Sequence, residues 1–97
     1  MIEGLLRWYA ARCDGAWEHR YGFTIESCDN PGLQVTVDIA TEPALRPEAD
    51  RPLTQEEDEP GVSMMIRDRK LVAFAAPGRE RQMLDRVDRF LAGAPAG

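Results

Sequence analysis

Apolar residues near both ends of the chain recur at the spacing of an α-helix. In residues 2–13 they are Ile2, Leu5, Leu6, Tyr9, Ala10 and Cys13, and in residues 79–91 they are Met83, Leu84, Val87, Phe90 and Leu91. This period predicts two amphipathic helices, each with one buried face. Asp14-Gly15 follows the first pattern directly and predicts its end.

Between these helices the period of the apolar residues changes to two, which is typical of strands. We expect strands over residues 23–28, 33–40, 62–67 and 71–76. The segment Asp29-Asn30-Pro31-Gly32 predicts a tight hairpin turn, because Pro31 presets the first central φ angle and Gly32 can take a positive φ. Asp68-Arg69 predicts a second hairpin turn.

Residues 41–60 lack such a pattern and are rich in proline and acidic residues. Four prolines interrupt two arginines and seven acids, which are Glu42, Glu48, Asp50, Glu56, Glu57, Asp58 and Glu59. One interpretation is a solvated loop with a short edge strand near Leu53 to Glu57. The other is an acidic surface for a basic partner, with Glu56, Glu57, Asp58 and Glu59 as its candidate residues. The sequence alone leaves both interpretations open.

Together these elements predict one α+β domain over residues 1–92, followed by a disordered tail over 93–97. Their order is helix, two strands, a possible edge strand, two strands and helix. Because tight turns join paired strands, we expect an antiparallel sheet of four to five strands. The N-terminal and C-terminal helices must both bury an apolar face, so we expect them on one face of that sheet. A chain of 97 residues can bury one modest core.

Charge and composition restrict the classes of partner, and the cellular compartment, that we expect for this protein. Seventeen acidic and twelve basic residues give a net charge of −5, with a pI near 4.8. That balance argues against a nucleic acid partner and against an anionic membrane surface. The N-terminal residues do not resemble a signal peptide, and no apolar run is long enough for a membrane helix. Cys13 and Cys28 are too few for a disulfide-stapled scaffold, so we expect a cytoplasmic protein with both thiols free.

Candidate catalytic chemistry is sparse. His19 is the only histidine, and it stands beside Glu18 and six residues after Cys13. A Cys–His nucleophile pair is conceivable, but nothing in the sequence marks an oxyanion hole. One histidine and two isolated cysteines do not make a metal site, and no glycine-rich phosphate loop is present. We therefore expect no catalytic residue, no cofactor and no metal, hence no enzyme.

Trp8, Trp17 and Tyr21 have two interpretations. In a domain of this size, such residues most often wedge a helix against a sheet. They are also the residue types that dominate binding hot spots, so an aromatic patch for a partner is the alternative.

Residues 16–39 resemble the immunity protein 53 family of bacterial polymorphic toxin systems. The family's pattern is an N-terminal Trp-Tyr helix, then Trp-Glu-His, Tyr-Gly, a strand into Asp-Asn-Pro-Gly, and a second strand ending in Asp. The matching positions are Trp8, Tyr9, Trp17, Glu18, His19, Tyr21, Gly22, Asp29, Asn30, Pro31, Gly32 and Asp38. Ala16 and Leu33 depart from the pattern, which has Asp and Trp there. After residue 40 the match is only in outline.

The resemblance implies a non-catalytic immunity protein, or antitoxin, that binds a cognate toxin domain and blocks it by occlusion. It would act as a monomer or homodimer. The alternative is a housekeeping interaction or regulatory domain with a different protein partner. The motif residues then have two possible roles. They are either toxin-facing or structural, with His19 or Glu18 bonding across to the hairpin turn and fixing the first helix on the sheet.

Overall fold

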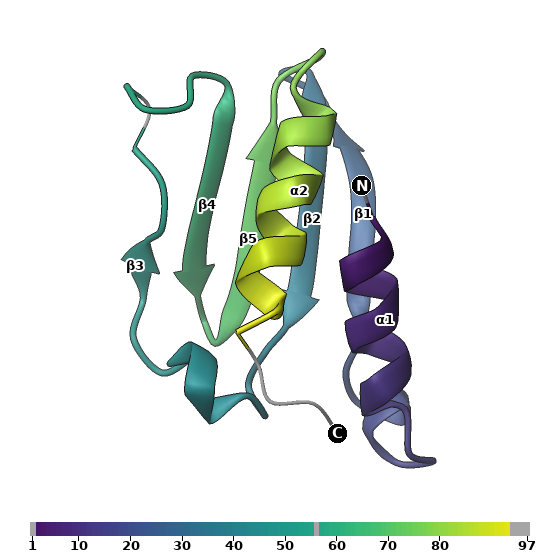
Figure 1. Ribbon diagram of the computed structural model, residues 1–97. Helices are drawn as coiled ribbons and strands as arrows, with labels where there is room; N and C mark the ends of the chain where they lie inside the picture. Colours follow the sequence, from purple (N-terminus) through teal and green to yellow (C-terminus); the bar gives the residue numbers. More distant parts are fainter. Residues whose placement is uncertain (1, 56, 94–97) are drawn as a thin grey trace.

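The computed structural model describes residues 2–55 and 57–93, which form an α+β fold of two layers, with helices packed on one sheet (Figure 1). The helices in this part are α1 (Glu3–Arg12) and α2 (Glu80–Leu91), with short 3₁₀ turns η1 (Trp17–His19) and η2 (Pro43–Leu45). The strands are β1 (Phe23–Cys28), β2 (Gly32–Asp38), β3 (Arg51–Pro52), β4 (Val62–Arg67) and β5 (Lys70–Ala75). The predicted fold class and element order are confirmed.

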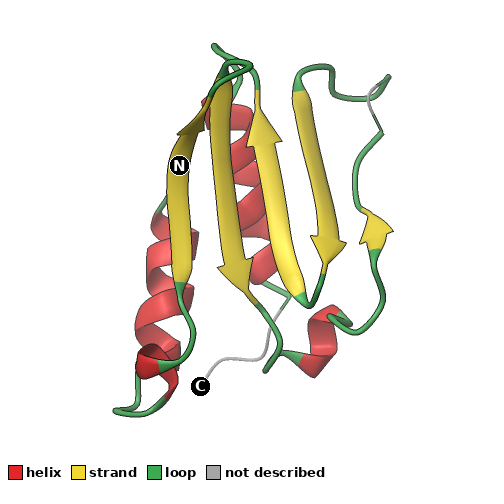
Figure 2. Cartoon of the chain, turned by 180° about the vertical axis from the view of Figure 1, so that it is seen from behind, coloured by secondary structure: helices red, strands yellow, loops and turns green. Residues whose placement is uncertain are grey.

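Every pair of neighbouring strands is antiparallel, in the order β1-β2-β5-β4-β3 (Figure 2). The tight hairpins β1–β2 and β4–β5 account for two of these contacts. The central contact joins β2 to β5, with Val35 opposite Ala73. This pairing brings together segments more than thirty residues apart in the chain, so the two hairpins share one sheet.

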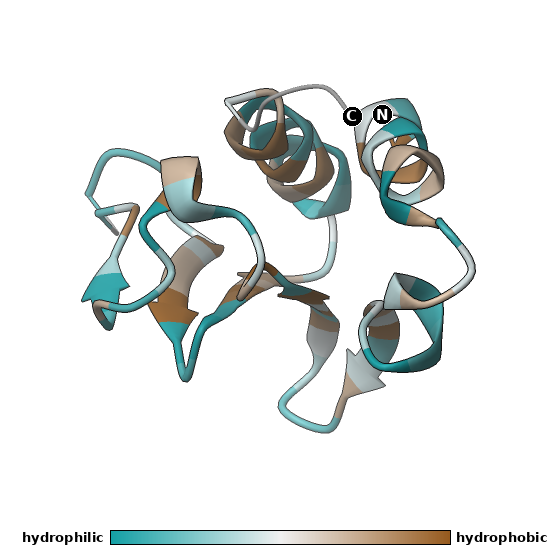
Figure 3. Ribbon diagram, turned by 90° about the horizontal axis from the view of Figure 1, so that it is seen from below, coloured by the Kyte–Doolittle hydropathy of each residue, from teal (hydrophilic) through white to brown (hydrophobic). Residues whose placement is uncertain are grey.

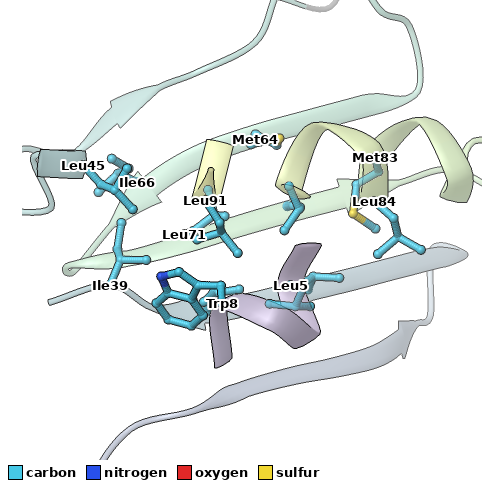
Figure 4. Packing of buried hydrophobic residues seen from close by; sticks show 14 of the residues in the cluster. Leu5, Trp8, Ile39, Leu45, Met64, Ile66, Leu71, Met83, Leu84 and Leu91 are labelled. Carbon is cyan, nitrogen blue, oxygen red and sulfur yellow. The ribbon is translucent and has the colours of Figure 1, made fainter. Parts of the chain in front are cut away.

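Both helices cover the same face of the sheet (Figure 3). The strand residues that face them are buried, as Val35, Val37 and Leu71 show with no exposed surface. From α2 the side chains of Met83, Leu84, Val87 and Leu91 complete the core (Figure 4). The predicted apolar face of the C-terminal helix is therefore the buried one.

The buried stripe of α1 differs from the prediction. Leu5 and Trp8 are buried, whereas Leu6 is 48% exposed and the predicted stripe residues Ala10 and Cys13 are exposed. The short helix packs against both the sheet and α2, and the side of α1 that carries Leu5 and Trp8 faces them. Apolar residues on either side of this buried face remain at the surface.

The edge-strand prediction also needs correction, whereas the second hairpin turn is confirmed. The edge strand was expected near Leu53 to Glu57, but β3 is Arg51–Pro52. The Leu53 N–H still donates to Met64 O at 2.8 Å, and this one bond ends the pairing. At the other hairpin, Asp68 and Arg69 form the expected turn with φ angles of 52° and 63°. Positive φ at both central residues is the turn geometry that matches strand twist.

Neither helix of the described residues combines the length and apolar character needed to cross a membrane.

Candidate functional site

The aromatic residues of the motif form a packed cluster between α1 and the start of β1. Trp8 and Trp17 are buried, and their rings meet edge to face with centroids 5.6 Å apart. Tyr21 packs on Trp17 at 5.8 Å. Trp17 donates its indole N–H to the Thr41 hydroxyl at 3.1 Å, which ties η1 to the segment after β2. This cluster has the geometry of a wedge between helix and sheet, with both indole rings buried and Tyr21 half-buried.

Glu18 closes the loop that follows α1. Its carboxylate accepts the backbone N–H groups of Asp14 and Gly15 at 2.9 and 2.8 Å. The Asp14 carboxylate in turn accepts those of Ala16 and Trp17, at 2.9 Å each. Glu18 therefore does not bond across to the hairpin turn, contrary to the structural role predicted for it. The nearest donors are local, because the N–H groups of Asp14 and Gly15 already lie beside the Glu18 carboxylate.

These hydrogen bonds favour the charged carboxylates. The pKa of Asp14 is lowered from its ordinary value, chiefly by the Trp17 N–H and then by that of Ala16. The pKa of Glu18 is lowered chiefly by its own backbone N–H, with further contributions from Asp14 and Gly15. Both groups thus stabilise the loop in their ionised state.

His19 and Cys13 are both exposed, at either end of this loop. The His19 backbone N–H donates to Ala16 O at 3.2 Å, as part of the 3₁₀ turn. Across the described residues, no group of three or more His, Cys, Asp or Glu side chains is arranged to hold a metal ion.

Asp38 joins three strands at the opposite end of the first hairpin from its turn. Its carboxylate accepts the Gly22 N–H at 2.8 Å, and its own N–H donates to Gly22 O at 2.9 Å. The Lys70 ammonium lies 3.5 Å from the other carboxylate oxygen. Asp38 thereby ties the entry of β1 to β2 and β5.

Gly32 does not take the positive φ expected of it in the turn. It is the first residue of β2 and pairs with Cys28, so the turn consists of residues 29–31. A Cβ atom at position 32 would lie 2.4 Å from Phe74 Cε2 and 2.6 Å from Ala75 O. Glycine is needed here for close approach, since the Phe74 ring and the β5 backbone occupy the space of a side chain.

Of the six described acids in the 41–60 segment, three make contacts with other elements of the fold. Glu42 is buried and pairs with Arg12 of α1. Asp50 accepts the Asp68 N–H at 3.0 Å at the β4–β5 turn. Glu59 is half-buried and pairs with Arg86 of α2. These contacts join distant segments, so much of this acidic segment is structural.

Among the candidate acidic residues, Glu57 and Asp58 are exposed and Glu56 lies outside the described residues. The turn of residues 29–31 is exposed as well. Figures 1 and 2 place this turn and the connection between β3 and β4 at the same end of the sheet. Asp29 lies toward the β1 edge of the sheet at this end, and Glu57 and Asp58 lie toward the β3 edge. We call this end, defined by these three residues, the acidic end. The Trp-Glu-His residues and Asp38 lie at the opposite end.

Two carboxylates, those of Asp88 and Glu42, hold α1 in place, and the sequence pattern did not reveal either role. The Asp88 carboxylate of α2 accepts the N–H groups of Gly4 and Leu5 at 3.0 and 2.8 Å, and so caps α1. Arg12, at the other end of α1, lies over the Trp8 ring at 5.5 Å from its centroid while it pairs with Glu42. Asp88 and Glu42 each act on a helix far away in the chain, which local periodicity does not report.

A family model described as Immunity protein 53 matches residues 2–92 of the chain. No curated protein and no solved structure matches it.

Proposed function

The chain belongs to the immunity protein 53 family, and from that premise we propose that it binds a cognate toxin domain and neutralises it by occlusion. The family match over residues 2–92 is the observation that carries this proposal. Immunity implies a protein partner, and blocking a toxin's working surface requires no catalysis by the inhibitor. The protein would act in the cytoplasm of the cell that makes it.

The hydrogen bonds of the motif residues favour toxin binding through another part of the surface. The polar side-chain groups of Trp17, Glu18 and Asp38 form hydrogen bonds within the domain. A residue that holds the fold can still be required for immunity, because the binding surface depends on the fold. We therefore assign these motif residues a structural role and look for the toxin contact elsewhere.

We assign the contact with the toxin to the acidic end. Its exposed carboxylates belong to Asp29, Glu57 and Asp58, and the whole chain carries a net charge of −5. The turn that bears Asp29 is held by the β1–β2 hairpin, so its acid is presented on a rigid support. A basic patch on the toxin is the complementary surface.

The first experiment tests the function itself. The toxin domain encoded beside this protein's gene is expressed in cells with and without the protein, and the purified pair is tested for a complex. We expect survival only with the protein present, and a stable complex that buries about 800 Å² on each partner. Death in both cultures together with no complex would show that the partner is not this toxin and would favour a housekeeping interaction domain.

The second experiment tests the assigned surface. Glu57→Gln with Asp58→Asn removes two charges from the acidic end, whereas Glu48→Gln with Asp85→Asn removes two exposed charges elsewhere. Rim charges chiefly change the association rate. The first pair should slow association at low salt, and the difference should fade above about 0.15 M salt. Equal rates for both pairs would contradict the assignment while leaving immunity intact.

A further inference from the structure

The two edges of the sheet differ in how they are protected from pairing with another chain. At one edge β3 has only two residues, and one of them is Pro52, which has no N–H to donate. At the other edge β1 has six residues, of which 24–27 are exposed. It contains neither lysine nor proline. A long edge without these protective residues is a template for another strand.

The hydrogen bonds of the sheet show which backbone groups of β1 face outward. Asp38 donates its N–H to Gly22 O, so these two residues form a hydrogen-bonded pair. Bonded and non-bonded pairs alternate along antiparallel strands. The even-numbered residues of β1 are therefore bonded to β2. The N–H and C=O groups that face away from the sheet belong to Phe23, Ile25 and Ser27.

Exposed apolar side chains accompany this edge. In the part of the chain that the structure describes, the exposed large apolar residues are Leu6 and Ile25, at 48% and 39%. The Tyr9 ring of α1 packs on Phe23 of β1 at 5.2 Å. From that contact, Leu6 lies one helical turn toward the N-terminus of α1 and Ile25 lies two residues along β1. Figure 1 shows α1 lying along this edge of the sheet, beside β1.

We propose that a second copy of this chain pairs with β1, antiparallel, across a two-fold axis at Ile25. In this register Ile25 faces Ile25 of the partner subunit, and Phe23 faces Ser27 of the partner subunit. All of these residues present outward backbone groups, so each facing pair exchanges both of its N–H···O bonds. The two sheets become one, and the unprotected edge of each copy is covered.

The side chains favour a second copy in this register. Ile25 meets an identical apolar side chain, and such cross-strand pairs are favourable. Thr24 faces Glu26 of the partner subunit, so no two like charges stand opposite each other. The neighbouring register, centred on Glu26, would set two carboxylates face to face. The antiparallel arrangement also carries the acidic ends of the two copies apart and leaves both accessible.

Sedimentation or light scattering over a concentration series to about 100 µM measures the association. Ile25→Lys sets two ammonium groups against each other and removes the apolar pair, so the dissociation constant should rise about tenfold or more. Thr24→Lys is the matched control, with the same added charge one residue away. Its ammonium would face Glu26 of the partner subunit, so its dissociation constant should equal that of the wild type or fall below it.

Circular dichroism and a thermal melt show whether Ile25→Lys folds as a monomer, as its exposed position requires. Hydrogen exchange at the Ile25 amide gives an independent reading, because this N–H should be protected only at concentrations where the dimer forms. A wild-type protein that stays monomeric throughout would overturn the proposal. So would an equal loss of association in both lysine variants, or an Ile25 amide that is protected only when the toxin domain is bound.

Discussion

Gly4 offers the sharpest test of how the two helices are held together. In an open helical position, replacing glycine by alanine stabilises a protein by about 0.5–1 kcal/mol. At position 4, however, a Cβ atom would lie 2.7 Å from Asp88 Cγ and 2.8 Å from Asp88 Cβ. Asp88 would have to move, and its bonds to the N–H groups of Gly4 and Leu5 would lengthen.

The magnitude follows from these opposing effects. Loss of a helix cap costs about 0.5–2 kcal/mol, and overpacking costs about 1–3 kcal/mol. Together these two costs exceed the helix-propensity gain, so Gly4→Ala should destabilise the protein by about 1–2 kcal/mol. In a domain of this size that lowers the melting temperature by about 4–8 °C per kcal/mol. Urea unfolding monitored by circular dichroism measures the change in free energy.

A series at position 88 shows whether the contact is the cause. Asp88→Gly removes the three atoms nearest to the new Cβ, so Gly4→Ala should become stabilising in that background, by about 0.5–1 kcal/mol. Asp88→Ala keeps the Cβ at 2.8 Å and should relieve only part of the clash. Asp85→Ala, at an exposed acid on the same helix, should leave the effect of Gly4→Ala unchanged. If Gly4→Ala has the same sign in all backgrounds, the reasoning is wrong.

Two further predictions concern the motif. Gly32→Ala should destabilise the protein by about 1–3 kcal/mol, because a Cβ would strike the β5 backbone. Gly22→Ala should be nearly neutral, because no atom lies within 4 Å of its Cβ position. Equal unfolding midpoints for the two variants would contradict this prediction. Asp14 and Glu18 have lowered pKa values in the folded state, so their stabilisation is complete above the ordinary carboxyl values of about 4 and is lost as the pH falls through the lowered ones. Asp14→Asn with Glu18→Gln should therefore reduce the loss of stability between about pH 5 and 3, and a pH dependence equal to that of the wild type would refute the assignment.

Secondary structure and the two hairpins were accessible from sequence because their signals are local, whereas the central pairing of β2 with β5 was not predicted. Apolar periodicity located both helices and four strands, and the short turns fixed which strands pair as hairpins. The side-chain roles were less accessible. Gly32 looks like a turn glycine from its neighbours, but its requirement comes from Phe74 and Ala75, more than forty positions away.

The acidic residues show the same limit. Glu42 stands in a polar, proline-rich segment that resembles a solvated loop, yet it is buried because Arg12 on α1 meets it. Asp88 lies among charged residues on α2 and gives no sign that it caps another helix. Such roles depend on which elements pack together. The position of the acidic end likewise required the fold, because it joins a turn near residue 30 with a loop near residue 58.

The strand order determines when, during synthesis, the sheet of a new chain can be completed. β5, which lies between β2 and β4, comes from residues 70–75, and the helix that covers it ends at residue 91. The β1–β2 hairpin is therefore translated well before its neighbour in the sheet. At about 5–20 residues per second, synthesis of the chain takes about 5–20 s. The sheet can be completed only after β5 has been made, and a chain that stops before residue 70 lacks the centre of its own sheet.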